Sequence, residues 1–129
     1  MLKRGILNPA VSSLLARVRH TNTLVIADRG FPYWPSVETV DISLVDDIPK
    51  VLDVLHAIRE NFVFGKAFMA EEFRVANAPD TVARFEALLK PADLVLEPHV
   101  EFKKRVPAAI GIIRTGDTVQ YANVILESA

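Results

Sequence analysis

The sequence predicts an α/β fold, a three-layer α/β/α sandwich around a largely parallel, Rossmann-like sheet. Segments with the apolar spacing of helices alternate with short β-branched runs along most of the chain. One of these runs, residues 23–27, is apolar without alternation, which is typical of a strand buried on both faces. The chain has 129 residues, half of them apolar, so we expect one domain over residues 1–129.

The first expected helix begins at Asn8 and Pro9, an N-cap residue followed by proline at the first helical position. Its apolar residues recur three or four positions apart, and we expect it to end near Arg19. His20 then lies at the exit of this helix, and the run TLVIAD forms a strand that stops at Asp28. A histidine and an aspartate are therefore expected at the two ends of one short strand.

The next segments continue the alternation of strands and helices. The expected elements are, in order, a half-buried strand over 40–44, a helix opened by residues 46–49 and ended at Gly65, a strand over 66–73, a helix capped by Asp80, a strand over 93–98 and a short helical turn over 99–106. Residues 108–126 predict two strands joined by a turn at Gly116 and Asp117, as a terminal strand pair.

Composition excludes several classes of function. The formal net charge is −1 and there is no run of like charges, so a nucleic-acid footprint and a cationic membrane face are both missing. The chain contains no cysteine, which excludes disulfides, thiol nucleophiles and thiolate metal sites. Phosphate-binding GxxxxGK[ST] and GxGxxG loops, HExxH and GxSxG are all absent. The N-terminus is a poor signal peptide and no run is long enough to span a membrane, so we expect a cytoplasmic protein.

Several polar residues follow the predicted strands. Asp28, Glu71, Glu72 and His99 all come at or just after a strand's carboxyl end. In open α/β sheets ligands bind at this edge, so these side chains are expected to converge on one rim.

The histidines have competing interpretations. His20 could exchange protons near neutral pH, or it could bond the last carbonyls of the first helix. Asp28 could contact a ligand or accept a turn hydrogen bond in the loop after it. His56 is expected at the edge of a solvated helix face, and His99 either starts a helix or belongs to a site.

Aromatic and amide side chains add a second group of candidates. Phe31, Tyr33 and Trp34 share one loop, where they could stack on a sugar, form a subunit interface or fold back on the core. Tyr121 and Asn123 lie two apart in an expected strand and so share a face. Their uncharged donors and acceptors suit a hydroxyl-rich ligand, unless they only decorate the strand.

Five segments, spread over nearly the whole chain, resemble one known family. They are GILNP, HTNTLVIADRGFP, AEEF, HVEFKK and RTGDTVQYANVIL. In this order and spacing they are similar to the D-ribose pyranase and fucose mutarotase family (RbsD/FucU), with RTG…YAN and HT…VIAD…G.P closer to the ribose branch.

The resemblance implies a cofactor-free isomerase, without a metal, that interconverts pyranose and furanose rings or anomers of a free monosaccharide, D-ribose or a related sugar. It also implies pentameric rings paired into homodecamers, with sites between neighbouring subunits. Carried over by motif, His20 is the general acid/base. The implied sugar contacts are Asp28, His99, Tyr121 and Asn123, with the backbone of Ala122.

The chain departs from the ribose pattern near the expected pocket. Ribose-type members usually carry Ala-Gly-Leu-Pro after the aspartate, where this chain has residues 29–32 as Arg-Gly-Phe-Pro, followed by Tyr33 and Trp34. Asn22 stands where aspartate is frequent, and Val100 where glutamate is frequent. The sequence therefore leaves open an L-fucose-type mutarotase, or a non-catalytic sugar-binding subunit tied to sugar transport or regulation.

Overall fold

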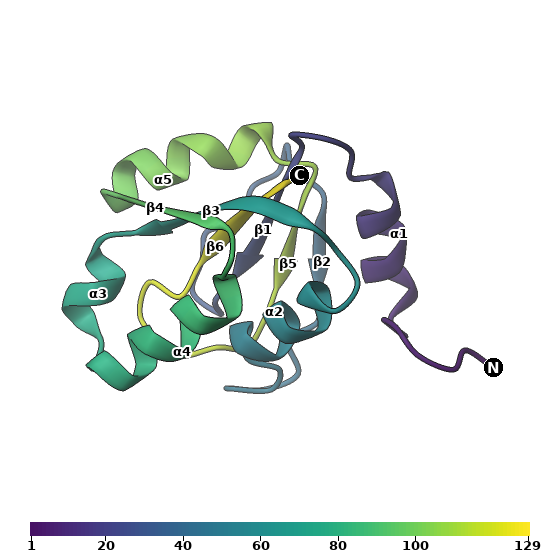
Figure 1. The fold of residues 1–129 in the computed structure, drawn as a ribbon, viewed down its shortest axis with the longest axis horizontal. Coiled ribbons are helices and arrows are strands. Elements are labelled where there is room, and N and C mark those ends of the chain that lie inside the picture. Colours follow the sequence, from purple (N-terminus) through teal and green to yellow (C-terminus); the bar gives the residue numbers. More distant parts are fainter.

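The computed structural model describes residues 1–129 and contains one six-stranded sheet in the order β2-β5-β1-β6-β3-β4 (Figure 1). The strands are β1 Thr23–Ala27, β2 Thr39–Asp41, β3 Phe64–Ala70, β4 Asp93–Glu97, β5 Gly111–Arg114 and β6 Val124–Ser128. The helices are α1 Pro9–Arg17, α2 Val51–Arg59, α3 Glu72–Ala76, α4 Pro79–Leu89 and α5 His99–Arg105, followed by a 3₁₀ turn at Val106–Ala108. Every pairing is parallel except the two made by β6. The predicted α/β class and largely parallel sheet are confirmed.

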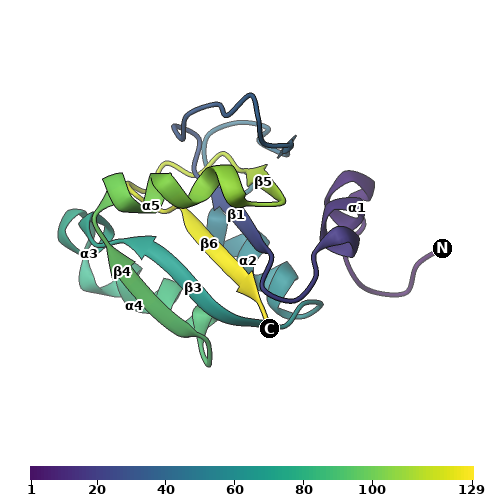
Figure 2. The same ribbon diagram turned by 90° about the horizontal axis from the view of Figure 1, so that it is seen from above.

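The core is divided by the sheet into two apolar clusters. The larger cluster holds the inner faces of α1, α2, α3 and α4, and the smaller holds Phe102 of α5 together with Phe31 and Val37 from the loop after β1. Figures 1 and 2 show α5 across the face of the sheet opposite α2 and α4. Because this second face has a single helix, the loop after β1 completes its cover.

Strand β1 is central to both clusters. Leu24 and Ile26 point into the larger cluster and Val25 and Ala27 into the smaller, all four fully buried. This is the alternation of side chains expected for a strand covered on both faces, and it confirms the interpretation of the apolar run.

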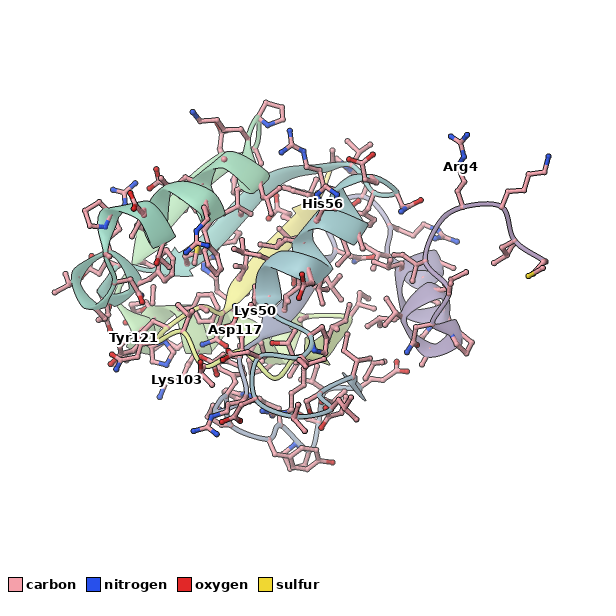
Figure 3. All side chains as sticks on the ribbon, turned by 90° about the horizontal axis from the view of Figure 1, so that it is seen from below. Arg4, Lys50, His56, Lys103, Asp117 and Tyr121 are labelled. Carbon is pink, nitrogen blue, oxygen red and sulfur yellow. The ribbon has the colours of Figure 1, made fainter.

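The start of α1 is also as predicted. The Asn8 side-chain oxygen accepts a hydrogen bond from the Val11 backbone N–H at 3.0 Å, with Pro9 at the first helical position. The first residues, including Arg4, form an arm that Figures 1 and 3 show extending away from the sheet. No helix in the structure combines the length and apolar character needed to cross a membrane.

The predicted terminal strand pair is wrong. Strands β5 and β6 do not pair with each other, because β1 lies between them, parallel to β5 and antiparallel to β6. The connection is the loop 115–123 rather than a tight turn at Gly116 and Asp117. This loop crosses the carboxyl end of β1, the edge at which open α/β sheets bind their ligands.

Four element boundaries also differ from those predicted. Strand β2 ends at Asp41, because the chain turns at Ser43 and closes a bridge between Val45 and Ile48. Helix α2 ends at Arg59, and Gly65 lies inside β3. Residues 72–76 form α3 instead of prolonging β3, and α4 begins after Ala78, which leaves Asp80 in its first turn rather than at the cap.

Candidate functional site

A cleft of about 330 Å³ opens at the carboxyl end of β1. Its walls come from the loop after β1, the first residue of α5 and the loop before β6. The lining residues are Asp28, Gly30, Phe31, Pro32, His99, Gln120, Tyr121 and Asn123. Its size lies at the lower end of the range for small-molecule sites.

Asp28 makes the turn hydrogen bond that the sequence left open, and it also borders the cleft. Its carboxylate accepts a hydrogen bond from the Gly30 N–H at 3.0 Å, which forms the turn, and it also lines the cleft. Its own backbone N–H donates to the Asn123 side-chain oxygen at 2.8 Å, joining the two loops. Burial raises the pKa of Asp28, although the N–H groups of Gly30 and Phe31 oppose this shift.

Asp28→Asn is expected to raise the melting temperature at pH 7. A raised pKa means that folding favours the protonated carboxyl, so its ionised form at neutral pH lowers stability, and an amide removes that effect. The gain should shrink as the pH falls toward about 4, where the carboxyl of the unfolded chain is also protonated. Thermal melts of both proteins between pH 7 and pH 4 measure this. A variant less stable than wild type at pH 7 would show that the bond to Gly30 outweighs burial.

His99 is both the first residue of α5 and a wall of the cleft. Both oxygens of Glu72 accept from its backbone N–H, each at 3.0 Å, which fixes the start of the helix. Burial lowers the pKa of the His99 imidazole, and the Lys103 cation lowers it further. Glu71 and Glu72 do not line this cleft, so the four side chains expected at one rim do not all converge there. Asp28 and His99 line the cleft, and Glu72 supports it through its hydrogen bonds to His99.

Tyr121 and Asn123 meet at the cleft without sharing a strand. Both belong to the loop before β6, and Tyr121 has φ +56°, a left-handed conformation that costs a tyrosine about 1 kcal/mol. This conformation accompanies contact of its ring with His99 at 5.2 Å between centroids. Ala122, between them, is fully buried in the larger cluster, and Asn123 is nearly so. The predicted strand placement was wrong, while the predicted proximity is correct.

The three aromatic residues of the loop after β1 have different environments. Phe31 lines the cleft and packs into the smaller cluster, and Trp34 packs behind it at 6.3 Å between ring centroids. Tyr33 is exposed. The Arg114 guanidinium holds this loop by donating to the carbonyls of Arg29 and Pro32, each at 3.2 Å. Of the three rings, Phe31 and Trp34 thus fold back on the core and Tyr33 does not.

Sequence reasoning missed Gln120 and Asp117. Gln120 lines the cleft, and its backbone carbonyl accepts a hydrogen bond from the Asn77 side-chain amide at 2.9 Å. Asp117, almost fully buried, accepts from the N–H of Val51 at 2.9 Å and of Val119 at 2.8 Å. Figure 3 shows it beside Lys50, at the start of α2. For Gln120 the only signal in the sequence was its position next to Tyr121. For Asp117 the neighbouring residues gave no signal.

His20 lies away from this cleft. It precedes β1 while Asp28 follows it, and five residues at about 3.3 Å each put roughly 16 Å between the ends of the strand. His20 does not bond the last carbonyls of α1, which was the alternative role that the sequence allowed. The Arg19 side chain instead donates to the carbonyls of Ala16 and Val18 at the end of α1. His20 is exposed, as is His56 on α2.

The side chains of the cleft are of the kinds found in sites for organic ligands. No group of three or more histidine, aspartate or glutamate side chains lies close enough to hold a metal ion. The cleft instead combines one carboxylate, one imidazole, a phenol and two amides around the Phe31 ring. Such a mixture binds several hydroxyl groups and one apolar face.

Comparison with known proteins finds relatives over the whole chain. The sequence matches the RbsD / FucU transport protein family over residues 1–129. It is 38% identical to D-ribose pyranase of Bacillus cytotoxicus, covering 99% of this chain and 97% of that one, and 31% identical to that of Enterococcus faecalis, with the same coverage.

Solved structures agree with this relationship. Bacillus subtilis RbsD complexed with D-ribose superposes with a TM-score of 0.93 at 33% identity, covering 100% of this chain and 98% of that one. The fucose mutarotase of Streptococcus pneumoniae, in complex with L-fucose, has a TM-score of 0.83 at 19% identity, covering 99% and 98%, which shows the shared fold alone. With a match along its full length and relatives above 30% identity, the chain belongs to the RbsD/FucU family.

Proposed function

We propose that this protein is a monosaccharide pyranase, an isomerase that interconverts the pyranose and furanose forms of free D-ribose or a closely related sugar. The observation that carries the proposal is the cleft itself, which gathers Asp28, His99, Tyr121 and Asn123 from three separate segments. The 38% identity to D-ribose pyranases over the full chain supports ribose as the first sugar to test.

The proposed reaction needs one proton handler and a site that fixes the sugar. The anomeric hydroxyl loses its proton, the bond between the anomeric carbon and the ring oxygen breaks, and the ring oxygen gains a proton. The open aldehyde then closes through a different hydroxyl, with the two proton transfers reversed. A histidine can serve as acid or base in both directions. Holding the open-chain sugar in a geometry that favours ring closure supplies the remaining acceleration. We assign the proton transfers to His20 and the sugar contacts to the cleft, including the backbone around Ala122.

His20 can serve the cleft only from another subunit, because β1 separates the two within one chain. We therefore propose a homo-oligomer in which His20 of one copy completes the cleft of its neighbour. Pentameric rings, paired into decamers, are the form expected from the family, and light scattering measures the mass. A monomer that is fully active would contradict this part of the proposal.

Cytoplasmic location also stays a prediction, tested by cell fractionation.

Saturation-transfer NMR on free sugars tests the activity. Irradiating a β-pyranose resonance of ribose should reduce the furanose resonances faster with the protein than in buffer, because catalysed ring opening connects them. L-Fucose, run in parallel, tests the fucose-type alternative through exchange between its anomers. Sugar binding without faster exchange for any sugar would favour the non-catalytic binding subunit and overturn the enzyme.

A further inference from the structure

The two nitrogens of the His99 ring have different surroundings. Nδ1 is buried and has no hydrogen-bond partner, one of two such side-chain atoms in the chain, with Trp34 Nε1. Nε2 is not among those buried atoms and makes no hydrogen bond within the protein, so it remains open to the cleft that His99 lines. The ring therefore offers one nitrogen to a ligand and hides the other.

Three aromatic rings surround the imidazole of His99. Phe102 is stacked on the imidazole at 5.9 Å between centroids, with 15° between the planes. Tyr121 and Phe31 meet it edge-on, at 5.2 and 6.4 Å. None of these rings supplies an oxygen or nitrogen partner to the buried Nδ1.

A neutral imidazole carries one N–H donor and one lone pair. A proton on Nδ1 would bury a donor without an acceptor, and orphaned buried N–H groups are rare because they lose their bond to water. Protonating both nitrogens would bury a charge as well. A proton on Nε2 alone leaves only the lone pair of Nδ1 buried and presents the N–H to the cleft. We propose that His99 is held as the neutral Nε2–H tautomer and donates a hydrogen bond to an oxygen of the bound monosaccharide, without exchanging protons with it. This rests on the proposed function for the identity of the ligand.

The charges around the ring agree with a neutral imidazole. Burial and the Lys103 cation, one turn along α5, lower the pKa of His99, while the carboxylates of Glu72 and Asp28 oppose them more weakly. Glu72 is occupied by the His99 backbone N–H, and Lys103 has no ion-pair partner. Figure 3 labels Lys103 and Tyr121 toward the same end of the molecule. The lowered pKa of His99 thus favours the neutral imidazole over the cation.

This tautomer gives His99 and His20 different roles in the site. A fixed N–H donor can stabilise a sugar oxygen that gains negative charge during ring opening, and the donor itself is neither protonated nor deprotonated. His20 is then the single side chain assigned to proton transfer. The acid limb of the pH–rate profile should accordingly be the same in wild type and in a variant that lacks a titratable group at residue 99.

Two amide substitutions distinguish the nitrogens. The amide of His99→Gln reaches the position of Nε2, whereas that of His99→Asn reaches only the position of Nδ1. We expect the glutamine variant to lose roughly 3- to 5-fold in kcat/KM for ribose exchange and the asparagine variant roughly 10- to 100-fold. The glutamine variant should keep the wild-type acid limb. Equal losses, or a larger loss with glutamine, would overturn the assignment.

A direct measurement needs neither a sugar nor a variant's activity. In protein labelled with ¹⁵N-histidine, the three histidines give separate imidazole patterns, and the one missing in His99→Gln belongs to His99. Nε2 should show the shift of a protonated nitrogen and Nδ1 that of an unprotonated one, unchanged from pH 8 to pH 6. A protonated Nδ1, or a cation forming in this range, would overturn the proposal. If no sugar is exchanged, the proposed function fails while this tautomer is still decided.

Discussion

His20→Ala is expected to lower the rate of ribose ring exchange by roughly 10²- to 10⁴-fold, the usual contribution of a general acid/base. Sugar binding should persist, because the sugar contacts are assigned to the residues that line the cleft and not to His20. Saturation-transfer NMR measures the rate, and fluorescence of Trp34, the single tryptophan, measures binding through its contact with Phe31. His56→Ala is the matched control, since His56 is equally an exposed histidine outside the cleft. Undiminished exchange in His20→Ala would remove it from the mechanism.

Mixing subunits tests where His20 acts. Co-expressed His20→Ala and Asp28→Asn chains should recover about a quarter of the wild-type rate, because in a mixed ring one site in four joins an intact His20 to an intact Asp28. Each variant alone should be nearly inactive. If each site used His20 and Asp28 of the same chain, every site in the mixture would carry one lesion. No recovery in a mixed oligomer would therefore contradict a shared site.

The residues that the sequence placed correctly are those governed by local rules. Asp28 and His99 follow strands of a parallel sheet, and the carboxyl ends of such strands share one edge wherever the strands stand in the order. The N-cap at Asn8 and the doubly buried β1 likewise depend on neighbours in sequence. Each of these was predictable because no long-range pairing decides it.

The errors came from pairings between distant segments. Nothing in residues 108–126 indicates that β1 lies between their two strands, since the same apolar alternation would suit a hairpin. The loop over the end of β1 then puts Gln120 into the cleft and gives Tyr121 its left-handed backbone. The role proposed for His20 likewise depends on a contact that the chain does not make with itself, because His20 is exposed and lies at the other end of β1 from the cleft.

Asp117→Ala is expected to lower the free energy of unfolding by about 3–5 kcal/mol, because it leaves one buried and one partly buried N–H group without their carboxylate acceptor. One is the Val51 N–H, at the start of α2, and the other is the Val119 N–H, in the loop that leads to the cleft. The carbonyl of Asp117 also accepts from the Arg29 N–H at 3.0 Å, so this residue joins both loops of the site to a helix. Urea unfolding of the two proteins measures the difference.

Asp53→Ala supplies the matched comparison at the same helix end. Asp53 accepts from the Lys50 N–H at 2.7 Å, but it is exposed, so water replaces the lost bond and about 1 kcal/mol or less is expected. The contrast isolates burial, since both carboxylates satisfy N–H groups at the start of α2. Equal costs would mean that the loop is held instead by Asp47, whose carboxylate accepts from the backbone and hydroxyl of Thr118 at 3.0 and 2.8 Å. A larger cost for Asp117, accompanied by weaker sugar binding, would show that the carboxylate stabilises the fold and the cleft through the same loop.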